Sequence, residues 1–168
     1  FGYFSPDGMN FDPQMKVIDA VRKIAEYVDL GGGRHLSAMQ FLQHFMFSPL
    51  QQQNYIAKLS GGELRRLYLC TVLMQNPNFL VLDEPTNDVD VNTIRALEEG
   101  LENFAGCAVV ISHDRWFLDR ICTHILAFEG NGEVFYFEGS YSDYEINKAH
   151  RLGNEEIKKG RYRKLMED

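Results

Sequence analysis

The chain has 168 residues, of which 45% are hydrophobic and 24% are charged, and its net charge is −7. These values are ordinary for one globular domain with a core of its own. An acidic chain argues against a broad nucleic-acid surface, which requires clustered Lys and Arg. The longest apolar runs, 79–82 and 107–111, fall far short of the roughly 20 residues that cross a bilayer, so we expect no membrane span.

Cysteine usage and the start of the chain indicate a compartment. The three cysteines are odd in number, widely spaced and set in apolar segments: Cys70, Cys107 and Cys122. This pattern favours buried, reduced thiols over a disulfide or zinc framework and predicts a cytoplasmic protein. The first residues lack the charged and apolar regions of a signal peptide, so we interpret the start at Phe1 as a cut in a longer chain.

Charge is unevenly distributed along the chain. Residues 148–164 hold seven Lys or Arg against two Glu, which predicts an acidic body with a basic appendage. Clustered cations can bind RNA phosphates, whereas an ordinary solvated helix face needs no ligand. Both interpretations remain open for this tail.

The first third of the chain is predicted to be helical. Asp12 can cap a helix over 12–28 and Pro13 suits its first position. Apolar residues recur there at helical spacing: Val17, Ile18, Val21, Ile24, Ala25 and Val28. The triplet 31–33 then ends the helix, and because no Gly-Lys-Ser/Thr follows it, we interpret these glycines as a linker rather than a phosphate loop.

A second helix is predicted to begin at Ser37, where Gln40 completes a capping box. It runs to about Phe47, before Pro49. A further helix is expected from Ser60 to about Gln75.

Helices and strands alternate after that point. The continuous apolar run 79–82 is typical of a strand buried on both faces, and 107–111 is a second such strand. Helical spacing marks a helix between them through Ile94, Leu97, Leu101 and Phe104. A strand, a helix and a strand in this order predict a parallel crossover.

The last third predicts smaller elements. A short helix from Arg115 to about Cys122 precedes strands near 124–128 and 134–137, which Gly130 and Gly132 join as an edge hairpin. A loosely docked helix follows Tyr141. The chain is therefore predicted to be α/β, with a helical part at 1–58, a parallel-sheet half at 59–139 and a charged helical tail at 140–168.

Two carboxylates follow the first of the predicted buried strands. Asp83 and Glu84 lie at the carboxyl edge of a parallel sheet, which is the usual ligand site of open α/β folds. One carboxylate in this position can hold Mg²⁺ through water, and the next can orient a water for attack on a γ-phosphoryl group. We assign the first role to Asp83 and the second to Glu84. An isolated Asp-Glu pair would more often be a solvated strand end.

Two further features favour the catalytic interpretation. The second buried strand brings Ser112-His113-Asp114 to the same sheet edge, where His113 could hydrogen-bond a phosphate oxygen. The segment Ser60-Gly61-Gly62-Glu63 combines a capping box with two glycines at a helix start. Free amides and the positive end of the helix dipole make that segment an anion site.

These residues resemble the ATP-binding-cassette family. Leu59 to Glu63 is similar to its signature loop, 79–84 to its Walker B strand, 85–90 to its D-loop and His113 to its switch histidine. The runs 84–87 and 112–119 are similar to the ABC-F group, and 106–144 resembles the second cassette of that group. The resemblance implies a partial cassette of the P-loop NTPase type.

The resemblance also implies ligands and partners. It implies that ATP and Mg²⁺ are bound, that Glu84 and His113 are catalytic, and that Asp83 serves the metal. Ser60, Gly61, Gly62 and Asp90 are implied to bind nucleotide, the signature loop reaching the nucleotide of the other cassette in the same polypeptide. ABC-F proteins act on ribosomes, which implies contacts with rRNA and tRNA and none with a membrane.

The sequence departs from the family in two places. No Gly-x-x-x-x-Gly-Lys-Ser/Thr occurs, so we expect the phosphate-cradling Walker A loop to precede Phe1 in the parent protein, and we expect this chain alone to be inactive. Gly2 to Pro6 resembles the strand that leads into the Q-loop, so 1–58 comprises a remnant of that strand and the helical part. Pro6 stands where the Q-loop glutamine is expected, and it lacks a side-chain oxygen and an amide hydrogen. Two alternative functions therefore stay open: a nucleotide-binding subunit of a transporter, and a non-catalytic interaction module.

Overall fold

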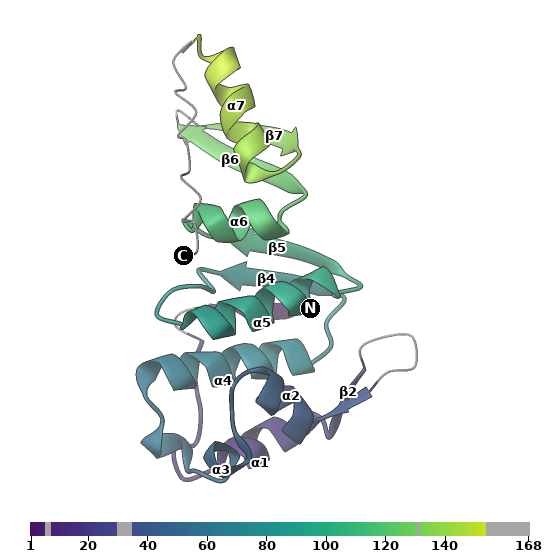
Figure 1. Cartoon of the computed structure of the whole chain (residues 1–168), viewed down its shortest axis with the longest axis vertical. Helices are drawn as coiled ribbons and strands as arrows, with labels where there is room; N and C mark the ends of the chain where they lie inside the picture. Colours follow the sequence, from purple (N-terminus) through teal and green to yellow (C-terminus); the bar gives the residue numbers. More distant parts are fainter. Residues whose placement is uncertain (6–7, 30–34, 131, 154–168) are drawn as a thin grey trace, which may run out of the picture. The chain divides into compact units, whose positions relative to one another are not determined.

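A computed structural model describes residues 1–5, 8–29, 35–130 and 132–153 of the chain. The chain divides into two compact units, Phe1–Ile121 and Cys122–Asp168, which Figure 1 shows coloured along the sequence. Pro6, the glycine triplet 31–33 and the tail beyond residue 153 lie outside the described residues, so the expectations for these positions stay predictions.

A parallel sheet forms the frame of the first unit. Its strands are β1 (Gly2–Phe4), β4 (Phe79–Asp83) and β5 (Cys107–Ile111), in the order β1-β4-β5. Both pairings are parallel, and β4 and β5 are in register from Phe79 opposite Cys107 to Asp83 opposite Ile111. The predicted parallel crossover is confirmed, because α5 (Val91–Glu102) connects β4 to β5.

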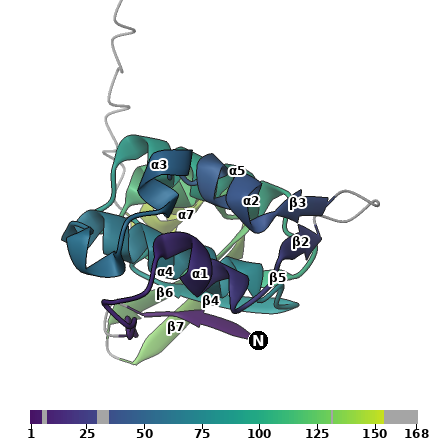
Figure 2. The same cartoon turned by 90° about the horizontal axis from the view of Figure 1, so that it is seen from below.

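Helix α4 (Gly61–Met74) lies between this sheet and a group of short helices (Figures 1 and 2). Those helices are α1 (Val17–Arg22), α2 (Ala38–His44), α3 (Pro49–Gln52) and the 3₁₀ turn η1 (Ile56–Lys58). Helix α6 (Arg115–Ile121) ends the unit. One buried cluster joins the layers, with Phe4 and Leu82 from the sheet, Leu67 from α4, and Val17 and Phe41 from the short helices. The helical third and the half-sheet therefore share a single core.

The helix predicted over 12–28 is wrong at both ends. Helix α1 begins only at Val17, because the backbone N–H of Val17 donates to Asn54 O (3.1 Å) and Met15 O accepts from Ile56 N–H (2.9 Å). The residues before α1 form a turn, in which the N–H of Met15 donates to Asp12 O (3.1 Å), and Lys16 forms an antiparallel bridge with Tyr55. Strand β2 (Tyr27–Asp29) then pairs antiparallel with β3 (His35–Ser37), so the end of the predicted helix is a strand.

The helix predicted from Ser37 is confirmed at its start and ends earlier than expected. Ser37 caps α2, and its capping box with Gln40 is complete. Met46 adopts a left-handed backbone conformation (φ 61°) that ends the helical path. Ser48 then starts α3, with Pro49 in the first turn.

The expectation that both sheet strands are buried on two faces is wrong. Leu80 and Leu82 are fully buried, whereas Phe79 is 37% exposed and Val109 and Ile111 of β5 are 43% and 50% exposed. Side chains alternate between the faces of a strand, and the described helices cover only one face. The apolar runs predicted the two strands, but they did not indicate whether other elements of this chain cover both faces of the sheet.

The second unit is a hairpin with one helix. Strands β6 (His124–Gly130) and β7 (Glu133–Glu138) pair antiparallel, as predicted, and Gly130 and Gly132 have the positive φ that the turn requires. Helix α7 (Tyr141–Arg151) packs on the hairpin through buried Tyr144 and through the Arg151 guanidinium, 3.4 Å from the ring centroid of Phe135.

Candidate functional site

Asp83, Glu84 and His113 meet at the carboxyl end of the parallel sheet, as predicted. Asp83 is the last residue of β4 and is paired with Ile111 of β5. The side chain of Glu84 is only 17% exposed, and its Oε1 lies 3.5 Å from Nε2 of His113, whose side chain is 99% exposed. A sheltered carboxylate thus faces an imidazole that is open to solvent.

The backbone of Glu84 is held in an unusual conformation. Its φ is +47°, in the left-handed region that a residue with a side chain seldom adopts. The N–H of Glu84 donates to the carbonyl of Ile111 at 2.8 Å, which extends the β4–β5 pairing by one bond. Such strain costs on the order of 1–3 kcal/mol and is concentrated at functional positions.

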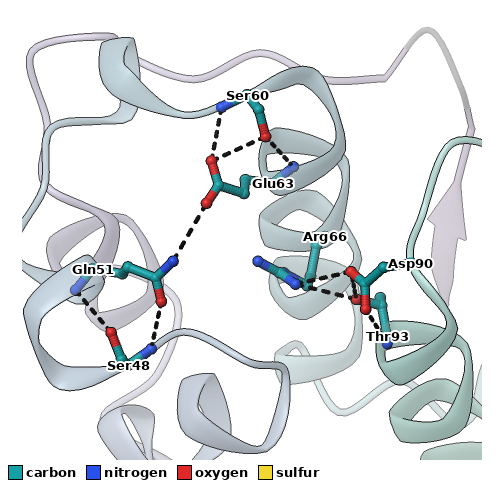
Figure 3. Close-up of polar contacts among 7 residues, drawn as sticks. All are labelled: Ser48, Gln51, Ser60, Glu63, Arg66, Asp90 and Thr93. Atoms are coloured by element: carbon teal, nitrogen blue, oxygen red, sulfur yellow. Dashed lines mark hydrogen bonds and ion pairs between the residues drawn. The ribbon is translucent and has the colours of Figure 1, made fainter.

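The predicted signature loop is a complete capping box (Figure 3). Oγ of Ser60 accepts from the N–H of Glu63 (3.3 Å), and Oε2 of Glu63 accepts from the N–H (2.8 Å) and the hydroxyl (3.0 Å) of Ser60. These bonds position the start of the 14-residue helix α4, whose N-terminal amides and dipole attract anions. The Ser60 amide is the main cause of a lowered pKa for Glu63.

The two glycines of the loop have different surroundings. A Cβ on Gly61 would meet nothing within 4 Å, so the backbone at Gly61 is open to a ligand. A Cβ on Gly62 would lie 3.0 Å from the carbonyl oxygen of Asp88. The start of α4 therefore touches the loop that follows the strand-end carboxylates, and only a glycine fits at the contact without displacing it.

Asp90 has structural partners in this chain. It caps α5 by accepting from the N–H (3.0 Å) and the hydroxyl (2.7 Å) of Thr93. Its Oδ2 also accepts from Nη1 of Arg66 at 3.0 Å (Figure 3). Burial raises the pKa of Asp90, but the bonds from Thr93 and the charge of Arg66 outweigh it and lower that pKa. The predicted nucleotide contact of Asp90 stays a prediction.

Arg66 is the residue of this region that sequence reasoning missed. It is 8% exposed and its guanidinium lies over the Phe47 ring, 4.7 Å from the centroid. It follows Glu63 by three positions on α4, so the two side chains share a helix face. That spacing was the signal available in the sequence. Arg66 connects the helix of the signature loop to the cap of the next helix.

A second capping box lies beside the signature loop. Ser48 and Gln51 form it at the start of α3, and Nε2 of Gln51 donates to Oε1 of Glu63 at 3.4 Å (Figure 3). The pattern Ser-x-x-Gln at 48–51 was visible in the sequence, but its connection to Glu63 was not.

The donor set at the strand end suits Mg²⁺ that is bound together with phosphates. Among the described residues, no group of three or more His, Cys, Asp or Glu could hold a metal ion. Mg²⁺ is commonly bound by one or two carboxylates together with the phosphates of a substrate and water. Asp83 at the sheet edge fits that mode, and the residues fit a metal shared with a nucleotide.

Two other expectations bear on the class of protein. All three cysteines are free. Burial raises the pKa of the Cys70 and Cys122 thiols, whereas Cys107 is exposed, contrary to the expected burial. In the part of the chain that the structure describes, no helix has the length and apolar character to span a membrane.

Comparison with known proteins agrees with the resemblance seen in the sequence. Residues 2–87 match the family described as ABC transporter. An uncharacterized ABC transporter ATP-binding protein, YfmR, of Bacillus subtilis is 50% identical over 149 residues, covering 88% of this chain and 24% of the relative. The energy-dependent translational throttle protein EttA of Mycobacterium tuberculosis is 48% identical over 84% of this chain and 26% of its own length. The Escherichia coli EttA is 46% identical over 80% of this chain and 24% of its own length.

This chain therefore spans about a quarter of the length of these curated relatives. The fold is also shared with solved cassettes. The structure of an ATP-binding subunit of an ABC transporter superposes with a TM-score of 0.61 at 19% identity, over 90% of this chain and 62% of that one. A dimeric ATP-binding cassette bound to ADP and Pi gives 0.59 at 19% identity, over 82% and 62%. The predicted α/β fold, a partial cassette of the P-loop type, is confirmed.

Proposed function

Since the chain belongs to the ABC transporter family, we propose that it is part of an ABC-F ATPase that binds and hydrolyses ATP to regulate translation on the ribosome. The observation that carries the ATPase proposal is the pairing of sheltered Glu84 with His113 beside Asp83 at the end of the parallel sheet. The relatives called translational throttle proteins support the ribosomal part.

Each residue of the strand-end group has a separate role in this proposal. Asp83 holds Mg²⁺ with the phosphates, and Glu84 accepts a proton from the attacking water as general base. His113 donates a hydrogen bond to a phosphate oxygen, which its full exposure allows. Mg²⁺, when bound, neutralises charge on the phosphates.

The signature loop serves a different nucleotide in this proposal. Ser60, Gly61 and Gly62 bind the ATP held by the other cassette of the polypeptide, and the N-terminal end of the α4 dipole attracts its phosphates. Asp90, which caps α5, also binds nucleotide in this proposal. The amides that cradle the phosphates of this cassette come from a part of the parent outside this chain, because no Walker A motif occurs in it. We therefore propose that ATP hydrolysis requires the full-length parent.

The partners follow from the same proposal. They are the ribosome with its rRNA and tRNA, and the second cassette of the polypeptide, in a cytoplasmic protein without a membrane partner. In this proposal residues 1–58 comprise the remnant of the strand that leads to the Q-loop and the helical part, 59–139 the signature helix and the catalytic half, and 140–168 the charged tail. The name of the Bacillus subtilis relative favours a second candidate, the ATP-binding subunit of a transporter. Co-sedimentation of the parent with ribosomes or with membranes distinguishes the two.

The test is ATP turnover by the full-length parent, with and without ribosomes, for the wild type and for Glu84→Gln. The substitution keeps the shape of the side chain and removes the base, so turnover should fall by about 10² to 10⁴. Glu102→Gln, at an exposed position at the end of α5, is the matched control and should turn over ATP normally. Unchanged turnover in Glu84→Gln would rule out Glu84 as the base. Absence of turnover in the wild type would favour the non-catalytic module.

A further inference from the structure

The side chain of Gln51 joins two capping boxes. Its Oε1 accepts from the N–H of Ser48 (2.9 Å), and its Nε2 donates to Oε1 of Glu63 (3.4 Å). The other oxygen of Glu63, Oε2, accepts from the N–H and the hydroxyl of Ser60. Figure 3 shows this series from Ser48 through Gln51 and Glu63 to Ser60. The two oxygens of the Glu63 carboxylate thus have different donors, one on each side.

We propose that Gln51 is a positioning residue for the signature loop, which it acts on by holding the Glu63 carboxylate in the orientation that orders Ser60. The inference rests on the proposed function, in which Ser60 binds the nucleotide of the other cassette. Gln51 itself touches no nucleotide in this proposal. It acts through Glu63, whose carboxylate is the acceptor for both donors of Ser60.

The contact with Glu63 requires glutamine, whereas the cap of α3 does not. A capping box needs only a side-chain oxygen at its fourth position, and glutamate supplies one as well as glutamine does. The Nε2 group is the feature that glutamate lacks, and Glu63 is its acceptor. Replacing Gln51 with glutamate therefore removes the link to the signature loop and leaves the local cap of α3 in place.

Gln51 lies on the short helix α3, which hydrogen bonds and packing hold in place. The next residue, Gln52, is completely buried, and its Nε2 donates to the carbonyls of Met39 (3.0 Å) and Phe47 (2.9 Å). Phe47 also lies under the guanidinium of Arg66, on the helix that the signature loop begins. The turn that bears Gln51 is thus fixed both to α2 and to α4, so it can hold Glu63 in a constant position.

The orientation of Glu63 matters because its charge lies next to the proposed phosphate site. A carboxylate in the first turn of α4 favours the helix dipole, but it would repel phosphate if it swung toward the open backbone at Gly61. The hydrogen bond from Gln51 draws one oxygen toward α3, and Arg66 offsets the charge from the next turn of the helix.

The test uses reciprocal substitutions in the full-length parent. Gln51→Glu places two carboxylates opposite each other and should lower kcat by about tenfold, the effect of losing a hydrogen bond to a charged group. The KM for ATP should change by less than about threefold, because in the proposed function the other cassette holds the nucleotide concerned and is unchanged by the substitution. The double variant Gln51→Glu with Glu63→Gln restores the bond with donor and acceptor exchanged, and should recover kcat to within about threefold.

Gln53→Glu is the matched control. It makes the same change two residues later, where Oε1 of Gln53 accepts from Nζ of Lys16 at 3.3 Å, and it should leave kcat unchanged. A lower pH should also restore kcat selectively in Gln51→Glu, because protonation of one of the two facing carboxyls recreates a donor. A merely structural defect would show neither the pH recovery nor the rescue by exchange.

Hydrogen exchange in the nucleotide-free parent gives a readout that does not depend on turnover. Peptides covering residues 60–64 should exchange faster in Gln51→Glu and return to the wild-type rate in the double variant. Unchanged exchange and kcat in Gln51→Glu, or a double variant no better than the single one, would overturn the proposal. Absence of ATP turnover in the wild-type parent would refute only the proposed function. The hydrogen-exchange measurement would still decide whether Gln51 positions the signature loop.

Discussion

Asp90 joins the cap of α5 to the buried guanidinium of Arg66, and substitutions there measure what this junction contributes to stability. Asp90→Ala removes the acceptor for the Thr93 N–H and the charge partner of Arg66. Loss of an N-cap costs about 1 kcal/mol. The bond to Arg66 contributes about another 1 kcal/mol, at the low end for charged pairs because the Asp90 side chain is 52% exposed. We therefore expect the free energy of unfolding to fall by about 2 kcal/mol.

A second substitution separates the two contributions. Asp90→Asn keeps an oxygen that caps α5, since asparagine is an equally good N-cap, and removes only the charge. Its expected cost is about 1 kcal/mol. Asp88→Asn is the matched control: Asp88 pairs with Arg65 at 3.3 Å, but its side chain is 85% exposed. Asparagine also tolerates the left-handed φ of +57° at this position, so the cost should be below about 0.5 kcal/mol.

The assay is urea unfolding of the chain, followed by far-UV circular dichroism at pH 7 and at pH 3. The pKa of Asp90 is lowered in the folded state, so its contribution is present above its ordinary pKa of about 3.9 and is lost as the pH falls below that value. The difference between wild type and Asp90→Ala should therefore be smaller at pH 3. An Asp90→Asn as costly as Asp90→Ala would show that the cap adds nothing. If Asp88→Asn lowers the free energy of unfolding as much as Asp90→Asn does, the argument that the less exposed ion pair contributes more is refuted.

Two further predictions concern a glycine of the signature loop and an ion pair of the hairpin unit. Gly62→Ala should be less stable to urea than Gly61→Ala, with a free energy of unfolding lower by about 1 kcal/mol or more. The reason is that a Cβ at position 62 meets the carbonyl of Asp88, whereas one at position 61 meets nothing. Equal stabilities would contradict this close approach. Arg151 is the main cause that lowers the pKa of Glu129 to about 2. Arg151→Gln should raise that pKa toward the ordinary value of about 4.3, as measured by carboxyl-carbon NMR titration, and an unchanged value would show that Arg151 is not the cause.

Capping boxes show how far local patterns predict this structure. The pairs Ser37 with Gln40 and Ser60 with Glu63 were recognised in the sequence, and the structure contains both. Each needs only two side chains three positions apart, so no information about distant residues is required. The predicted helix over 12–28 failed for the opposite reason. Its apolar spacing was helical, but backbone bonds to residues 54–56 and the pairing of β2 with β3 prevailed over it.

The position of the strand-end residues was predictable because it depends on topology. Parallel strands that follow one another through a helix end at the same edge, so Asp83, Glu84 and His113 had to come near each other once the strands were recognised. The left-handed backbone of Glu84 was not predictable from its residue type. The bond from its N–H to the carbonyl of Ile111, a residue 27 positions away in the sequence, could also not be read from neighbouring residues.

The sequence by itself determined the order of strands and helices in the sheet half, the caps of α2 and α4, and the position of Asp83, Glu84 and His113 at one edge of the sheet. All of these depend on neighbours within one or two turns of chain, or on the rule that parallel strands end together. Only the tertiary structure decided that Arg66 pairs with Asp90 and that Gln51 reaches Glu63. Those contacts join separate helices, and side chains distant in sequence come within hydrogen-bonding distance only after one core has packed their helices together.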